Sequence, residues 1–87
     1  MFFVYDLKFS KTAVEYLKKL DKNINERIVA SIDRIKIRPF AFVKRLVGSH
    51  YFSFRTGDYR LILSINQGEM VILVVEIGHR KNIYKNN

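Results

Sequence analysis

Two arginines stand where apolar segments of the chain begin or end. Arg60 opens the apolar run at 61–63, and Arg80 follows the last such run. Burial of a guanidinium without a partner is unfavourable, and the group stays charged at any working pH. It can donate paired hydrogen bonds to two phosphate oxygens at once. We therefore expect both arginines to face a phosphate rather than the core. The alternative for Arg60 is an ion pair with Glu76 or Asp58.

A tyrosine and a histidine close to Arg80 add two further kinds of chemistry. The ring of Tyr84 can stack on a base of single-stranded RNA, whose bases splay out. The imidazole of His79 titrates near neutral pH and can move a proton. Its alternative role is a hydrogen bond to the backbone at a strand end. If neighbouring strands run antiparallel, His79 and Arg80 converge on Arg60.

The composition excludes several other classes of site. The chain has no cysteine, two histidines and eight acidic residues, so no metal centre or other cofactor is expected. A net charge of +8 over 87 residues favours a polyanionic partner, namely nucleic acid, a membrane surface or an acidic protein. The alternative is a lysine-rich surface that only serves solubility. With no signal peptide and no span of membrane length, we expect a cytoplasmic protein without a membrane partner.

A single α+β domain over residues 1–87 is expected to position these side chains. An N-terminal strand is predicted over 2–9, and Ser10 is a helix N-cap. Asp21 caps a second helix, which ends before Pro39. The short link between the helices predicts an antiparallel hairpin. The apolar stripes that identify the two helices are Ala13, Val14, Leu17 and Leu20, then Ile24, Ile28, Ile32 and Ile35.

The second half of the chain changes to the alternation of strands. A short extended piece over 43–47 precedes strands over 51–56, 59–65 and 70–78, which form a three-stranded antiparallel meander with the helices on one sheet face. The last strand is apolar on both faces, which favours an interior position. In the strand over 59–65, alternation places Leu61 and Leu63 toward the helices and Arg60 on the opposite face.

Three segments together resemble the RelE/ParE superfamily of toxins: KRLVG at 44–48, FRTGDYRLIL at 54–63 and IGHRKNIY at 77–84. The upstream strand and helices occur in the same order, so the resemblance covers nearly the whole chain. It implies a RelE-like fold and a toxin of a type II toxin–antitoxin system. RelE-type members are metal-independent endoribonucleases (mRNA interferases). They cut mRNA on the ribosome by attack of a 2′-hydroxyl on the adjoining phosphate, and a RelB-type antitoxin protein neutralises them.

The resemblance also implies roles for particular residues. Arg60 contacts the phosphate and protonates the leaving group, while Arg80 stabilises the transition state. Tyr84 orients or stacks on the target nucleotide, and His79 stands where many relatives have histidine and others lysine. The expected RNA- and ribosome-binding residues are Lys44, Arg45, Arg55 and Lys81.

Two positions depart from the pattern of the superfamily. Some members carry two lysines on the strand before the Gly-Asp corner, and here those positions are Tyr51 and Ser53, both neutral. The general base is therefore open, with His79 and Tyr84 as candidates. Cleavage remains feasible, because stabilisation of the developing phosphorane charge is often the larger effect.

Two alternative functions remain within the same resemblance. ParE-like toxins share the fold and bind DNA gyrase, but they do not cleave RNA. The joint presence of Arg60, Arg80 and Tyr84 favours the nuclease, since ParE-like members tend to lack the full set. The other alternative is an inactive protein that only binds RNA or the antitoxin.

Overall fold

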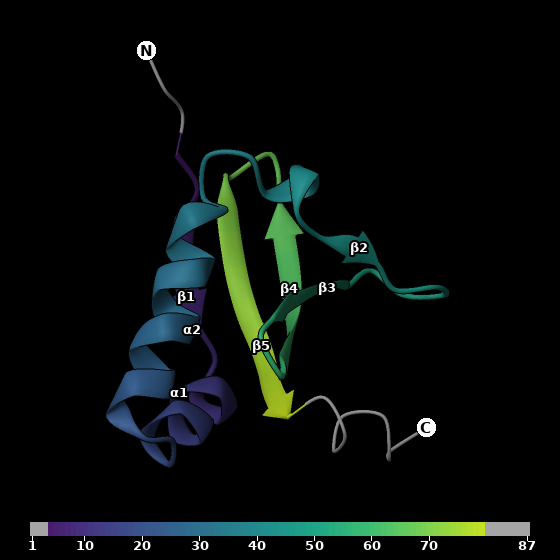
Figure 1. The fold of residues 1–87 in the computed structure, drawn as a ribbon. Coiled ribbons are helices and arrows are strands. Elements are labelled where there is room, and N and C mark those ends of the chain that lie inside the picture. The colour runs from purple at the N-terminus through teal and green to yellow at the C-terminus, as the bar shows by residue number, and fades with distance from the viewer. Residues whose placement is uncertain (1–3, 80–87) are drawn as a thin grey trace.

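The computed structural model describes residues 4–79, in which two α-helices pack on one side of a five-stranded sheet (Figure 1). The predicted α+β class, with the helices on one sheet face, is confirmed. The elements in chain order are β1 (Asp6–Phe9), α1 (Lys11–Lys18), α2 (Lys22–Arg34), a 3-10 helix η1 (Pro39–Ala41), β2 (Lys44–Arg45), β3 (Phe52–Thr56), β4 (Tyr59–Asn66) and β5 (Val71–His79).

The strands lie in the order β1-β5-β4-β3-β2. The predicted meander of β3, β4 and β5 is confirmed, and β5 lies inside the sheet as its two apolar faces indicated. The first strand pairs with the last in parallel, with Leu7 opposite Ile72. The segment predicted over 43–47 contributes only the two residues of β2, at the opposite edge.

Ser10 starts α1 and also joins it to the sheet. Its Oγ accepts a hydrogen bond from the backbone N–H of Ala13 at 3.0 Å, which confirms the predicted N-cap. The same hydroxyl donates to the carbonyl oxygen of Val75 at 2.6 Å. One side chain therefore fixes both the start of the helix and its place against β5.

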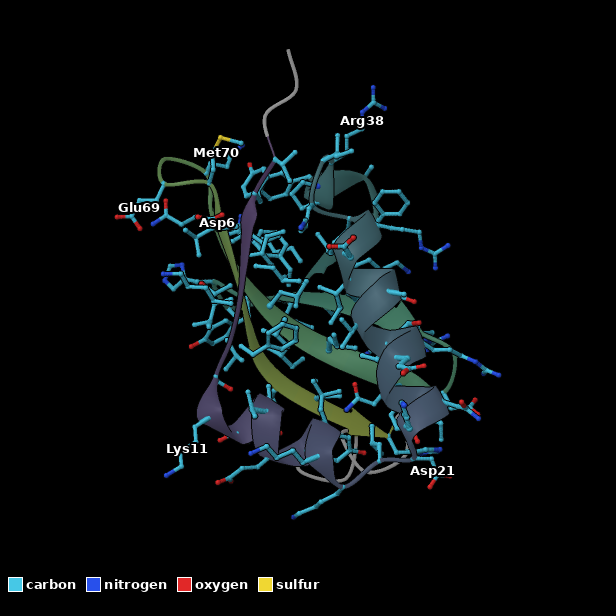
Figure 2. The ribbon with its side chains drawn as sticks, turned by 90° about the vertical axis from the view of Figure 1, so that its left-hand side faces the viewer. Asp6, Lys11, Asp21, Arg38, Glu69 and Met70 are labelled. Atoms are coloured by element: carbon cyan, nitrogen blue, oxygen red, sulfur yellow. The ribbon has the colours of Figure 1, made fainter. Side chains whose placement is uncertain are left out.

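The two helices are joined by a short link, as predicted, but they meet at a wide angle and do not run antiparallel (Figure 2). Figure 2 shows α1 crossing one end of the sheet, while α2 runs along the sheet from the labelled Asp21. Asn25 closes the link, because its Nδ2 donates to the carbonyl oxygen of Leu17 at 2.9 Å. Asp21 is the N-cap residue of α2, as predicted, but makes no capping hydrogen bond through its side chain.

The core lies between the helices and the sheet. On β4, Leu61 and Leu63 are fully buried, whereas Arg60 and Ile62 are partly exposed on the other face. The predicted orientation of Arg60, away from the helices, is therefore confirmed. The buried apolar residues are Tyr5, Ala13, Leu17, Ile28, Ile32, Ile35, Phe54, Leu61, Leu63, Ile72, Val74 and Ile77.

Gly57 shapes the β3–β4 turn, which brings two arginine-bearing strands together. Its φ is +59°, and Asp58 has no positive φ, as in a type II′ turn with glycine first. A Cβ built at Gly57 meets no atom within 4 Å. We therefore expect Gly57→Ala to fold and to lower the free energy of unfolding by about 1–2 kcal/mol, from backbone strain alone. Urea unfolding measures this, with Asp58→Ala as the control; a loss no larger than that of the control would contradict the assigned turn.

Candidate functional site

A basic hollow lies on the sheet face opposite the helices. Its volume is about 200 Å³, and it is lined by Phe42, Lys44, Ser53, Arg55 and Arg60. Three of these five side chains are cationic and none is acidic. Guanidinium and ammonium groups that converge in this way are suited to the oxygens of a phosphate.

The register of the strands brings the two arginines of this basic hollow together. Arg55 on β3 lies directly opposite Arg60 on β4, and such opposed residues have Cβ atoms about 4.5–5.5 Å apart. On its other side Arg60 lies opposite Gly78, which has no side chain to cover it. Because like charges directly opposite each other destabilise a sheet, this pair favours binding of an anion. The alternative role of Arg60, an ion pair with Glu76 or Asp58, stays a prediction.

The other positions near β2 and β3 that the sequence singled out differ in their access to the basic hollow. Ser53 is buried and lies opposite Lys44 on β2, so a neutral side chain occupies this position of the basic hollow. Tyr51 precedes β3, is exposed and does not line the hollow. Arg45 pairs with Phe52 and alternates away from Lys44. Phe42 also lines the hollow and was not among the predicted site residues, because no sequence motif marks it.

His79 lies on the sheet face opposite to Arg60. Its cross-strand partner is Tyr59, and the two rings meet edge to face with centroids 5.5 Å apart. The predicted convergence of the His79 side chain with Arg60 is therefore wrong. A catalytic role for His79 stays a prediction, which this register does not favour.

A β-bulge on β5 explains this difference. The register passes from Leu63 opposite Val74 to Ile62 opposite Glu76, which leaves Val75 as an extra residue. Since side chains alternate with a period of two, one extra residue moves every later side chain to the other face. Ile77 is accordingly buried with the helices, and His79 follows it to that face.

Tyr16 on α1 completes an aromatic group with Tyr59 and His79 at this end of the sheet. Burial raises the pKa of the Tyr16 hydroxyl above its usual value of 10.0. A hydrogen bond with the backbone of His79 opposes the rise in pKa, and nearby Tyr59 adds to it. Tyr16 is therefore neutral at physiological pH and serves to hold the end of β5 against α1.

A second hollow, of about 550 Å³, lies on the helix side between α2 and the β3–β4 turn. Near Thr56 the Oγ of Ser31 lies 2.8 Å from Thr56 Oγ1, and Arg34 donates to the same Oγ at 3.4 Å. We call this hollow the α2 groove; its walls are both apolar and basic. The lining residues are Ile24, Arg27, Ile28, Ala30, Ser31, Arg34, Thr56, Gly57, Asp58 and Tyr59.

Three predicted site residues, Arg80, Lys81 and Tyr84, lie outside the described residues, and their roles stay predictions. Within residues 4–79 there is no cluster of three or more histidine or acidic side chains that could hold a metal ion. No helix in that range is long and apolar enough to cross a membrane.

Comparisons with known proteins give a consistent family. Residues 7–84 match the family of the ParE toxin of the type II toxin–antitoxin system, parDE. Toxin RelG of Mycobacterium tuberculosis is 30% identical over 86 residues, which cover 93% of this chain and 97% of that protein.

Solved structures of toxin–antitoxin complexes have the same fold. The chain matches one from the RelBE2 complex of M. tuberculosis with a TM-score of 0.80 at 27% identity, covering 90% of this chain and 100% of that one. A chain of the archaeal RelE–RelB complex from Pyrococcus horikoshii OT3 gives a TM-score of 0.77 at 29% identity, covering 90% and 97%. The resemblance seen in the sequence is thus confirmed, and the chain belongs to the ParE toxin family, within the RelE/ParE superfamily of type II toxin–antitoxin toxins.

Proposed function

We propose that this toxin is a metal-independent mRNA endonuclease of the RelE type, which acts in the cytoplasm on ribosome-bound mRNA. The observation that carries the proposal is the basic hollow, where Lys44, Arg55 and Arg60 converge on the open sheet face. Cleavage by a 2′-hydroxyl places extra negative charge on the phosphate as the new P–O bond forms. Preorganised cations at that point stabilise the transition state more than the ground state.

The reaction proposed here needs no external nucleophile. The 2′-oxygen attacks the adjoining phosphorus and loses its proton to a base, while the 5′-oxygen of the next nucleotide leaves and is protonated. The products are a 2′,3′-cyclic phosphate and a 5′-hydroxyl end. We propose that Arg60 and Arg55 hold the non-bridging oxygens, which is supported by their position side by side in the basic hollow. We propose that Arg80 adds transition-state stabilisation, that Tyr84 orients the nucleotide, and that Arg45 and Lys81 contact ribosomal RNA.

The proposed protein partner is an acidic antitoxin of the RelB type. Two of the similar structures were solved as complexes with RelB proteins, which supports this partner. An amphipathic helix fits a groove with apolar and charged walls. The α2 groove offers Ile24, Arg27 and Arg34 on the helix side, and the β3–β4 turn with Asp58 on the other. To stop cleavage, the antitoxin must also cover Arg60 or displace the segment over 81–87.

A second candidate function is inhibition of DNA gyrase without RNA cleavage. The observation that favours it is the match to the family of the ParE toxin. The basic hollow favours the nuclease. Three cations around a phosphate-sized space suit the binding of a phosphate, whereas a protein–protein contact that inhibits gyrase does not require them.

One experiment separates these functions. The purified protein is added to a cell-free translation reaction, and the 5′ ends of a defined message are mapped with and without its start codon. We expect new ends within the coding region of the translated message only. Supercoiling by purified gyrase is measured in parallel. An intact message with inhibited gyrase would favour the second candidate, and an intact message with active gyrase would indicate a protein that only binds.

A further inference from the structure

Phe42 is an exposed aromatic residue at the rim of the basic hollow. The residue is 56% exposed, and no ring contact involves it among residues 4–79. The nearby Phe40, by contrast, packs edge to face on Phe52 with centroids 5.5 Å apart. Single exposed apolar side chains are common in proteins. This one is informative because it shares the hollow with Lys44 and other cations.

The backbone holds the ring of Phe42 in a defined place. The N–H of Phe42 donates to the carbonyl oxygen of Pro39 at 3.1 Å and closes the last turn of η1. Pro39 is buried, and Val43 packs against the core. The segment around Phe42 is thus anchored on both sides, so little conformational freedom is lost when a ligand meets the ring.

The size of the basic hollow determines which part of a nucleotide it can hold. At about 200 Å³ it is smaller than the roughly 300–1,000 Å³ of pockets that enclose drug-sized ligands. It suits one phosphate group, and the attached base must therefore lie outside, across the rim. An aromatic ring at a cationic groove is the arrangement by which proteins bind single strands, with the backbone on the cations and a base on the ring.

We propose that Phe42 is a base-stacking residue for single-stranded RNA, and that it holds the base next to the phosphate bound by Lys44, Arg55 and Arg60. The inference rests on the proposed RNA-cleaving function and adds to it a contact to a base, apart from the one expected of Tyr84. Stacking on Phe42 is tolerant of sequence, since every base has a π-face. It raises affinity and fixes the position of the nucleotide.

The test compares two short oligomers of equal length and charge, one an RNA and the other a ribose–phosphate chain without bases. Affinities are measured at one fixed low salt concentration. We expect Phe42→Ala to weaken RNA binding by roughly 5- to 100-fold and to leave binding of the base-free chain unchanged. Phe42→Tyr keeps the ring and should bind RNA as the wild type does. Ile37→Ala is the control, because Ile37 is 55% exposed and does not line the hollow.

The outcomes separate this inference from the proposed function. The stacking role is overturned if the wild type binds RNA and Phe42→Ala binds it equally well. It is also overturned if Phe42→Ala weakens the affinity for the base-free chain as much as the affinity for RNA. In both cases the phosphate site stands. If the wild type binds neither oligomer and leaves translated messages intact, the proposed function fails and the stacking role fails with it.

Discussion

Arg60→Ala is expected to lower the rate of mRNA cleavage by about 100- to 1,000-fold, the usual cost of losing one preorganised donor to a developing oxyanion. Arg60 lines the basic hollow beside Arg55 and lies outside the core. The substitution removes the charge and paired donors at the phosphate and leaves the packing between helices and sheet in place. The measurement is the initial rate of cleavage of a translated message, with circular dichroism to show that the fold is retained.

Two further variants identify the chemical cause of the expected loss. Arg60→Lys keeps the charge and loses the bidentate geometry, so its rate should lie between those of Arg60→Ala and the wild type. Arg38→Ala is the matched control: Arg38 does not line the hollow, and Figure 2 shows its side chain pointing away from the rest of the fold. A folded Arg60→Ala protein that cuts at the rate of the Arg38→Ala protein would refute the phosphate role of Arg60.

Ala30→Trp is expected to weaken antitoxin binding by on the order of 100-fold. Ala30 is exposed on α2 and lines the α2 groove, so a bulky ring there occupies the space proposed for a partner helix. Loss of contacts at the centre of an interface costs about 2–4 kcal/mol or more. Isothermal titration with the proposed RelB-type antitoxin measures the change in affinity.

The design includes an internal control on the same helix. Val29→Trp adds the same ring at an exposed position of α2 that does not line the groove, and it should bind the antitoxin as the wild type does. RNA cleavage by Ala30→Trp should be unchanged, because the basic hollow lies on the other face of the sheet. Equal antitoxin affinities for the two tryptophan variants would show that the partner does not use the groove.

Local patterns in the sequence were sufficient to predict the elements and the position of Arg60. Ser10 lies at a helix start that its own side chain forms, and the alternation of β4 holds along the strand, so neighbouring residues decide both features. The partner of β1 could not be predicted in this way. Leu7 on β1 pairs with Ile72 on β5. These two segments lie far apart in the sequence, and neither carries a local pattern that shows which strand will be its neighbour.

The candidate site was predicted less completely, and for two physical reasons. One extra residue at Val75 moves the side chains that follow it to the other sheet face. No composition signal marks that bulge, so the expected convergence of His79 with Arg60 was wrong. Phe42 was overlooked because its role depends on which strands come to lie beside it, and the sequence shows only an aromatic residue after a proline. The roles of Arg80 and Tyr84 rest on the resemblance alone.

The position of β5 has a consequence for how the toxin is made. β5, the last strand within residues 4–79, lies inside the sheet, where β1 and β4 both hydrogen-bond to it. Because a ribosome releases the chain from its N-terminus, α1 and β1 emerge long before the strand against which they pack. Until residues 71–79 leave the ribosome, the helices have no complete surface on which to bury their apolar faces. The fold can therefore be completed only once β5 has left the ribosome and taken its place between β1 and β4.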